Sequence, residues 1–428
     1  MKLSDLIDFN PKRPLEKGAI TPFIEMADLP EGERDVSGIG NRVFNGGGSK
    51  FKNGDTLFAR ITPCLENGKT AKVSGLFNNA VGHGSTEFIV MAAKDPSVDE
   101  EFVYYVARHP EFRAYAKGRM EGTSGRQRVS WQAIADYAIP DFSNFERKRI
   151  GSVLSSIDNL IAANRHINET LEAMSRALFK AWFVDFEPVR AKLEGRWQRG
   201  QPLPALPMHL YDLFPDRLVE SELGEIPKGW KLTSLSEFSS LNPESWTKRT
   251  RPRKIRYVDL SNTKWGRIES VTNYEAEDAP SRAQRLLRPL DTIIGTVRPG
   301  NGSYAFIWDE GLTGSTGFAV LRPQRREYSE FVYLAATARE NIERLSNLAD
   351  GGAYPAVRPE IVSATQVPST NPELINEFSR QVSPMLASIA DNERVSHSLA
   401  QLRDTLLPKL ISGEFRISDA ERIVGAAV

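Results

Sequence analysis

The sequence predicts a mixed α/β (α+β) protein in which one domain occurs twice and two long antiparallel coiled-coil helices join the copies with approximate two-fold symmetry. Three observations predict this fold class. Short motifs recur about 230 residues apart, β-rich runs alternate with glycine-rich turns in each copy, and a stretch with a seven-residue apolar period follows each copy. This spacing is far too long for a solenoid repeat, so each copy should be a domain.

The duplication rests on short motifs that keep their order in both halves of the chain. Their offsets drift slowly, which is hard to obtain by chance. The matched pairs are Asn10-Pro11 with Asn242-Pro243, Asp55-Thr56-Leu57 with Asp291-Thr292-Ile293, Arg60 and Pro63 with Thr296 and Pro299, Ser85-Thr86 with Ser315-Thr316, Phe102-Val103-Tyr104 with Phe331-Val332-Tyr333, and Ile139-Pro140 with Val367-Pro368.

Changes in pattern along the chain predict four segments. Residues 1–144 form the first copied domain, and residues 226–370 form the second. Residues 145–225 hold a helical spacer and a proline-rich connector, which we interpret as an extended crossover because it shows no clear periodicity. A second helical spacer and a short tail occupy residues 371–428.

The two spacers show coiled-coil heptads, each with one asparagine at an a position. An antiparallel pairing would bring Asn164 and Asn392 near each other, where a buried asparagine fixes register. The a positions are Ile150, Ile157, Asn164, Leu171 and Leu178 in the first spacer, with Val153, Leu160, Ile167, Met174 and Ala181 at d; the second has Phe378, Met385, Asn392, Leu399 and Leu406 at a, with Val382 and Ile389 at e compensating for poorer d positions.

Composition describes an ordinary globular protein. Hydrophobic residues make up 40% and charged residues 26% of the 428 residues. The single cysteine, Cys64, excludes an internal disulfide framework and a multi-cysteine zinc site. No apolar run approaches a membrane span, and the start of the chain lacks the apolar core of a signal peptide. We therefore expect a cytoplasmic protein.

The charge balance argues against strong DNA binding by the chain alone. Lys+Arg and Asp+Glu both number 55, so no global basic excess attracts phosphates. Basic residues gather locally, however, at 113–128 and at 248–267, where Lys248, Arg249 and Arg251 begin the cluster. A solvated face is the simpler interpretation of each cluster by itself. Local patches on a neutral protein favour a weak DNA binder that works inside a larger complex.

Two motifs imitate catalytic sites. Gly68-Lys69-Thr70 ends a stretch that resembles a phosphate-binding loop, but Pro63 stands where that loop needs glycine and no helical pattern follows. The acids Asp141 and Glu146 are too close in sequence for a nuclease metal site. The five histidines lack ligand spacing, and no methyltransferase motif occurs. We therefore expect no catalytic residue, no metal and no cofactor on this chain.

Polar loops at matching places in both copies are the candidate DNA contacts. Arginine can recognise guanine, asparagine and glutamine can recognise adenine, and serine, threonine and lysine can hold phosphate. For any single residue, an ordinary turn is at least as good an explanation. The candidates are Arg60, Thr62, Asn67, Lys69, Ser85, Thr86, Arg126, Gln127, Arg128, Lys248, Arg249, Arg251, Arg298, Asn301, Ser303, Ser315, Thr316, Tyr354 and Arg358.

Four segments resemble the specificity subunits of type I restriction–modification systems. They are 54–63 in the first copy, 178–186 at the end of the first spacer, 223–230 at the start of the second copy, and 406–413 at the end of the second spacer. The second copy departs from the pattern, because Gly295-Thr296 replaces Ala59-Arg60. The resemblance covers essentially the whole chain.

The resemblance implies a non-catalytic, DNA-binding subunit of a phage-defence complex. Each target recognition domain would recognise one half of a split target in double-stranded DNA, and the helix pair would set the gap. Two DNA adenine methyltransferase subunits, which bind S-adenosylmethionine, would dock on it. Restriction/translocase subunits that use ATP and Mg would join for cleavage.

Three alternatives remain open from the sequence. The chain could serve a related methylation or phage-defence system without a nuclease, which this sequence cannot distinguish. A fused methyltransferase or nuclease would need one of the motifs that are missing. A coiled-coil protein scaffold would explain the helices but not two polar-looped domains. The target sequence and the gap length cannot be deduced from the residues.

Overall fold

The structure is a computed structural model that describes the whole chain except residues 124, 204–205, 222–223, 248, 353 and 428. The described residues divide into two compact units: unit 1 is Met1–His166 with Glu393–Val428, and unit 2 is Ile167–Asn392. Two helices are 40 residues long, α5 (Asn144–Phe183) and α10 (Pro372–Ile411). One part of each helix belongs to unit 1 and the other part to unit 2.

Unit 1 contains two four-stranded sheets. The first is entirely antiparallel, in the order β1 (Ile7–Phe9), β8 (Phe88–Ala93), β5 (Thr56–Ala59) and β6 (Thr70–Lys72). The second has the order β3 (Gly40–Val43), β2 (Ile20–Ile24), β7 (Gly82–Gly84) and β4 (Ser49–Phe51), and only its central pair is parallel. Apolar runs such as Phe88–Ala93 are buried on both faces, as expected for central strands.

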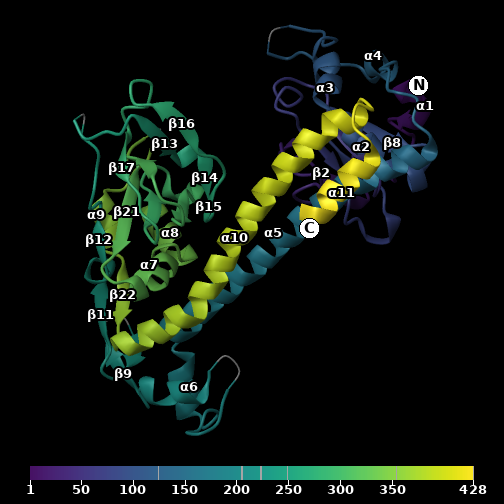
Figure 1. Cartoon of the computed structure of the whole chain (residues 1–428). Coiled ribbons are helices and arrows are strands. Elements are labelled where there is room, and N and C mark those ends of the chain that lie inside the picture. The colour runs from purple at the N-terminus through teal and green to yellow at the C-terminus, as the bar shows by residue number, and fades with distance from the viewer. Residues whose placement is uncertain (124, 204–205, 222–223, 248, 353, 428) are drawn as a thin grey trace. The chain divides into compact units, whose positions relative to one another are not determined.

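Unit 2, several strands of which are labelled in Figure 1, repeats both sheets with the same topology. Its antiparallel sheet has the order β12 (Ser239–Leu241), β21 (Phe318–Pro323), β18 (Thr292–Gly295) and β19 (Tyr304–Phe306). Its mixed sheet has the order β16 (Thr272–Glu275), β13 (Lys254–Val258), β20 (Leu312–Ser315) and β17 (Ala283–Leu286), again with a parallel central pair. The predicted mixed α/β fold with a duplicated domain is confirmed.

The matched asparagines show how closely the copies agree. Asn10 and Asn242 both adopt φ 47°, a left-handed conformation that asparagine tolerates better than most residues. The backbone N–H of each donates to the carbonyl of Val90 or Val320, and the side-chain Oδ1 of each accepts from the N–H of that same valine. The recurring Asn-Pro motif therefore fixes the chain beside the first sheet in both copies.

Helices cover the sheets in the same order in both copies. The recurring Phe-Val-Tyr motif lies buried in α2 (Pro96–Arg108) and in α7 (Ser329–Ala336). The remaining helices of the two domains are α1 (Leu3–Leu6), α3 (Pro110–Lys117), α4 (Trp131–Ala135), α8 (Arg339–Asn347) and α9 (Pro359–Ser363). Three two-stranded sheets lie in unit 2: β9 (Leu218–Ser221) with β10 (Gly224–Pro227), β11 (Lys231–Ser234) with β22 (Gln366–Ser369), and β14 (Thr263–Lys264) with β15 (Arg267–Ile268).

The connector differs from the extended crossover expected from its prolines. It contains α6 (Glu187–Leu193) and a 3₁₀ helix at Met208–Leu213. Trp197, Leu210 and Phe214 are buried in the core of unit 2. Aromatic residues spaced irregularly along a proline-rich segment give no periodic signal, but they can still bury apolar area. The tail ends in α11 (Ile417–Ala427), which packs in unit 1.

The helix pair is antiparallel in each unit, as predicted. In unit 1, Arg403 donates a hydrogen bond to Asp158, and Asn164 donates one to Ser396. In unit 2, Ser175 Oγ lies 3.5 Å from Met385 Sδ, and the rings of Trp182 and Phe378 lie 5.7 Å apart. Increasing residue numbers on α5 therefore meet decreasing numbers on α10.

The predicted d positions of α5 are wrong in the middle of the helix. Ile167 and Met174 are 47% and 50% exposed, whereas Asn168 and Ser175, one position later, are buried. A straight helix of 3.6 residues per turn drifts by about 20° per heptad, so the buried face moves from d to e. The central contacts are consequently polar: Asn164 Nδ2 donates to Ser396 Oγ (3.2 Å), and Asn392 Nδ2 donates to Asn168 Oδ1 (2.8 Å).

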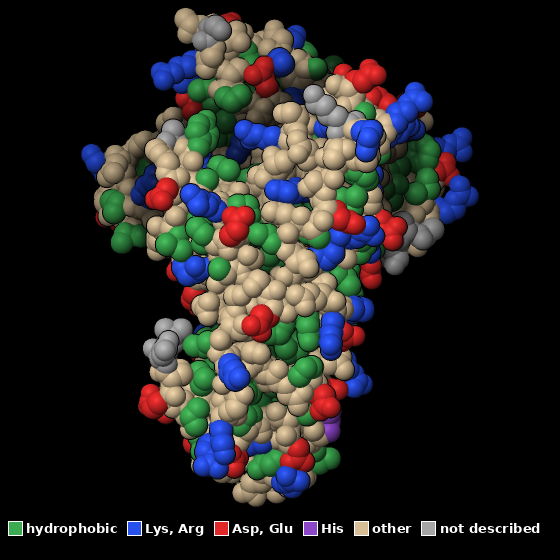
Figure 2. Space-filling model, turned by 90° about the vertical axis from the view of Figure 1, so that its left-hand side faces the viewer, with side chains coloured by type: hydrophobic (Ala, Val, Ile, Leu, Met, Phe, Trp, Pro, Cys, Tyr) green, Lys and Arg blue, Asp and Glu red, His purple; other side chains and the backbone are tan. Residues whose placement is uncertain are grey.

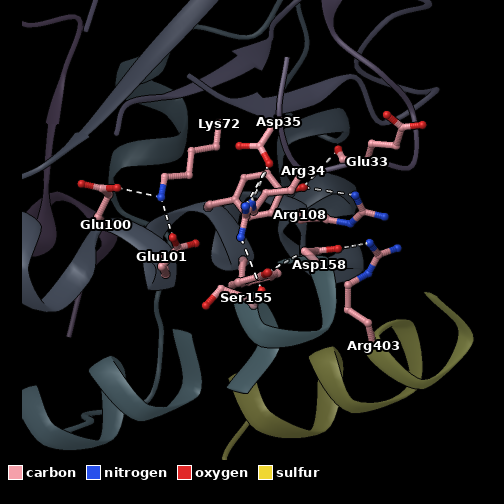
Figure 3. Close-up of polar contacts among 12 residues, drawn as sticks. Glu33, Arg34, Asp35, Lys72, Glu100, Glu101, Arg108, Ser155, Asp158 and Arg403 are labelled. Atoms are coloured by element: carbon pink, nitrogen blue, oxygen red, sulfur yellow. Dashed lines mark hydrogen bonds and ion pairs between the residues drawn. The ribbon is translucent and has the colours of Figure 1, made fainter. Parts of the chain in front are cut away.

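A buried charged network fastens the first domain to the helix pair within unit 1 (Figure 3). Asp158 accepts from both Arg403 and the Tyr105 hydroxyl, and the side chains of Asp158 and Arg403 are each 3% exposed. Burial raises the pKa of Tyr105 well above its ordinary value, so its hydroxyl remains a donor. Nearby, Lys72 pairs with Glu100 and Glu101.

His109 should make stability depend on pH. Burial lowers its pKa from the ordinary 6.5, opposed by Glu111. The unfolded chain therefore binds more protons, so the free energy of unfolding should fall as pH drops below about 6.5, by at most roughly 1.4 kcal/mol per pH unit. His109→Asn places a favourable N-cap residue before α3 and should flatten this slope in urea titrations at pH 5–8.

Two histidines serve as internal references for this prediction. His83, whose pKa burial also lowers, should leave a residual slope in the variant. His209→Asn makes the same substitution at an exposed position and serves as the control for the substitution itself. A variant of His109 with the full wild-type slope would contradict the assignment.

Candidate nucleic-acid interface

Three segments meet at one end of the first sheet in unit 1. The end of β5 hydrogen-bonds to the start of β8 through Arg60 N–H and the Glu87 carbonyl (3.0 Å). It also bonds to the segment 125–129, because Thr62 N–H donates to the Gln127 carbonyl (3.1 Å) and Val129 N–H donates to the Arg60 carbonyl (2.9 Å). We call residues 60–63, 85–87, 121–123 and 125–129 loop cluster 1.

Unit 2 holds the same segments with the same backbone hydrogen bonds. Thr296 N–H donates to the Gly317 carbonyl (2.8 Å), and Arg298 N–H donates to the Pro355 carbonyl (2.7 Å). Val357 N–H donates to the Thr296 carbonyl (2.9 Å). We call residues 296–303, 315–317, 350–352 and 354–357 loop cluster 2. These hydrogen bonds show which residues of loop cluster 2 correspond to which residues of loop cluster 1, because each donor and each acceptor in one cluster has one counterpart in the other.

The side chains at corresponding positions differ, although the backbone frame is shared. The pairs, with loop cluster 1 first, are Arg60 and Thr296, Thr62 and Arg298, Glu87 and Gly317, Arg126 and Tyr354, Gln127 and Pro355, and Arg128 and Ala356. Because the same backbone arrangement carries different side chains, the two loop clusters present two different surfaces.

In loop cluster 1 the candidate residues divide into exposed and anchored side chains. Thr86, Arg126 and Arg128 are exposed. Thr62 is anchored, because its Oγ1 accepts from the Gln127 N–H (3.0 Å). The Nε of half-buried Arg60 has no partner among the described residues.

The adjoining candidates in unit 1 also make local contacts. Asn67 Nδ2 donates to Glu31 (3.3 Å), and Lys69 Nζ donates to the Met26 carbonyl (3.0 Å). Ser85 Oγ accepts from the Glu87 N–H (3.1 Å), which shapes the turn into β8. Ser85 thus supports the backbone on which Glu87 is presented.

Loop cluster 2 presents an arginine over an aromatic ring. The Arg298 guanidinium lies 4.9 Å from the ring centre of Tyr354, which is 72% exposed. Asn301 and Arg358 are also exposed. Thr316 is half-buried, and its N–H donates to the Arg282 carbonyl (2.8 Å).

Several predicted contact residues instead hold the frame together. Ser303 Oγ donates to the Leu260 carbonyl (3.0 Å), and buried Ser315 accepts from the Gly317 N–H (3.2 Å). Arg251 donates to the Pro280 and Ala283 carbonyls. Arg249 is exposed, whereas Lys248 lies outside the described residues.

Sequence reasoning missed two residues of these surfaces. Glu87 binds Arg128, and the exposed Trp265 lies against Gly302 beside Asn301. Gly302 adopts φ 69°, and a Cβ there would lie 2.5 Å from the Trp265 ring. Neither Trp265 nor Glu87 is repeated in the other copy, so no recurring motif marks these two residues.

The surface carries charges of both signs. Figure 2 shows Lys and Arg side chains lying among Asp and Glu side chains on the face it presents. In unit 2, hydrogen bonds from Arg288 and Arg322 lower the pKa of Glu244 to about 2. Within the part of the chain that the structure describes, no group of three acidic, histidine or cysteine residues could hold a metal ion. None of the described helices is long and apolar enough to cross a membrane.

Comparison with known proteins gives relatives of one kind. The type I restriction enzyme HindI specificity subunit of Haemophilus influenzae is 25% identical over 406 residues, which cover 85% of this chain and 87% of that protein. The MjaIX specificity subunit of Methanocaldococcus jannaschii is 24% identical over 332 residues, covering 75% and 70%. These relatives confirm the resemblance to type I specificity subunits.

A solved structure supports the fold. The S subunit of a type I restriction–modification system from M. genitalium has a TM-score of 0.53, with 18% identity, and covers 96% of this chain and 95% of that one. No family model matches the sequence. The likeness to type I specificity subunits therefore extends over both copies of the domain and both long helices.

Proposed function

We propose that the chain is the sequence-specific DNA-binding specificity subunit of a type I restriction–modification complex. Each copied domain recognises one half of a bipartite target, and the helix pair sets the gap between the halves. The observation that carries this proposal is the pair of loop clusters, because one backbone frame presents different side chains in the two copies. Two domains that share a fold but recognise different DNA sequences would keep the same backbone and differ in the side chains of these loops.

The exposed side chains suit contacts with DNA. Arginine donates two hydrogen bonds to guanine, and glutamine and asparagine can do the same with adenine. Exposed Arg126 and Arg128 and half-buried Gln127 supply this chemistry in loop cluster 1, and exposed Arg298 and Asn301 supply it in loop cluster 2. Tyr354 adds an aromatic surface to loop cluster 2.

Partner subunits supply the chemistry in this proposal. Two DNA adenine methyltransferase subunits bring S-adenosylmethionine, and restriction subunits bring ATP and Mg. We propose domain boundaries at 1–144 and 226–370 for the recognition domains, with 145–225 and 371–428 as spacers. Asn164 and Asn392, with Ser396 and Asn168, set the register of the spacer helices.

Methylome sequencing of a host that carries the system tests the function. The expected result is one methylated motif made of two fixed half-sites separated by a gap of constant length and variable sequence. A single contiguous motif would contradict the proposal. So would methyl transfer or cleavage by the purified chain without its partners.

A further inference from the structure

Glu87 and Arg128 form a well-defined pair within loop cluster 1. Arg128 Nε donates to Oε1 and Oε2 of Glu87 at 3.0 and 2.9 Å, and Nη2 donates to Oε1 at 2.7 Å. The side chains are 42% and 23% exposed, so the pair lies at the surface. The hydrogen bonds to Glu87 raise the pKa of Arg128 above its ordinary value.

The geometry leaves one edge of the guanidinium available. Glu87 occupies the edge formed by Nε and Nη2, and Nη1 makes only a long contact with the Arg126 carbonyl at 3.4 Å. Arginine has five N–H donors in a planar fork. The outer edge, formed by Nη1 and Nη2, can therefore donate two parallel hydrogen bonds while Glu87 holds the inner edge.

The second copy lacks both members of the pair at once. The backbone frame puts Gly317 at the position of Glu87 and Ala356 at the position of Arg128. The supporting serine is kept, since Ser85 and Ser315 accept the same backbone hydrogen bond. The same backbone hydrogen bonds form in unit 2 without these two side chains. The Glu87–Arg128 pair is therefore a feature of the surface of the first copy only.

We propose that Glu87 is a positioning residue that fixes the Arg128 guanidinium for recognition of a guanine in the half-site bound by the first domain. Guanine presents O6 and N7 as acceptors in the major groove, and the outer edge of an arginine matches both. A long side chain held in advance loses less conformational freedom on binding. The inference rests on the proposed function and names one base contact within it.

Base preference at single positions tests the inference. Glu87→Gln, Glu87→Asp and Arg128→Ala are compared with wild type in the assembled complex, by selection from a random DNA library and by affinity for single-base variants. Arg128→Ala should lose about 5- to 150-fold of discrimination at one G·C pair. Glu87→Gln should lose part of it at that same pair, and Glu87→Asp should retain more.

Controls separate positioning from folding. Glu66→Gln removes the partner of Lys117, an ion pair of similar length in the same unit, and should leave every base preference unchanged. Melting temperatures of all variants should match wild type, because exposed pairs add little stability. Unchanged selectivity in both Glu87 variants, or a change at a different base pair from Arg128→Ala, would overturn the inference. A wild-type complex that selects no split motif would instead refute the proposed function.

Discussion

Asp158→Leu should destabilise unit 1 by about 3–5 kcal/mol, the usual cost of leaving one member of a buried ion pair without its partner. Arg403 is buried with Asp158 and would keep its charge, with the half-exposed Asp404 as its remaining partner. The Tyr105 hydroxyl would lose its acceptor. The measurement is the free energy of unfolding from urea titration.

A second substitution tests the cause of this loss. Asp158→Leu combined with Arg403→Met replaces both charges by apolar groups and should recover most of the lost stability, since such replacements are often neutral or stabilising. The matched control is Arg149→Met. Arg149 lies on α5, as Asp158 does, but its ion pair with Glu421 is half-exposed, so the substitution should cost at most about 1 kcal/mol. Equal losses for Asp158→Leu and Arg149→Met would contradict the role given to burial.

Lengthening both spacer helices should change the gap between half-sites and leave their sequences intact. Seven residues are inserted between Asn164 and Asn168, and seven more between Asn392 and Ser396. This choice keeps the Asn164–Ser396 contact on one side and the Asn168–Asn392 contact on the other, since two turns nearly restore the helix face. The insertion adds about 10 Å, so we expect a gap longer by about three base pairs.

The one-sided insertion is the control for the spacer experiment. Seven residues placed in α5 alone shift its contacts with α10 and should abolish assembly or site selection. Copurification with the methyltransferase subunits establishes that each variant assembles. If the doubly lengthened protein assembles and still selects the original gap, the helices do not measure the gap.

The duplication could be predicted from the sequence, whereas the sheet topology could not. Asn10-Pro11 recurs as Asn242-Pro243 because each asparagine occupies a left-handed backbone position that few residue types tolerate. The strands are two to six residues long, too short for their pairing order to appear in a periodic pattern. Two sheets per copy, one with a parallel central pair, became visible only in the structure.

The candidate contacts show where residue type alone misleads. Arg251 belongs to a basic cluster, yet its guanidinium binds backbone carbonyls within the second domain. Ser315 recurs because its hydroxyl shapes a turn. Glu87 escaped notice because an acid is not expected at a DNA surface until its arginine partner is seen. Sequence identifies which loops recur, but hydrogen bonds decide which side chains are available.

The central claim is that the two domains recognise the two half-sites independently. The most direct test compares two loop variants of the assembled complex by selection from a random DNA library. One carries alanine at Arg126, Gln127 and Arg128, and the other carries alanine at Arg298, Asn301 and Tyr354. Each lost base contact should cost about 1–3 kcal/mol of discrimination. We predict that each variant loses preference in one half-site only, a different half for each, with the gap unchanged. Loss of preference in both half-sites by either variant would contradict the account.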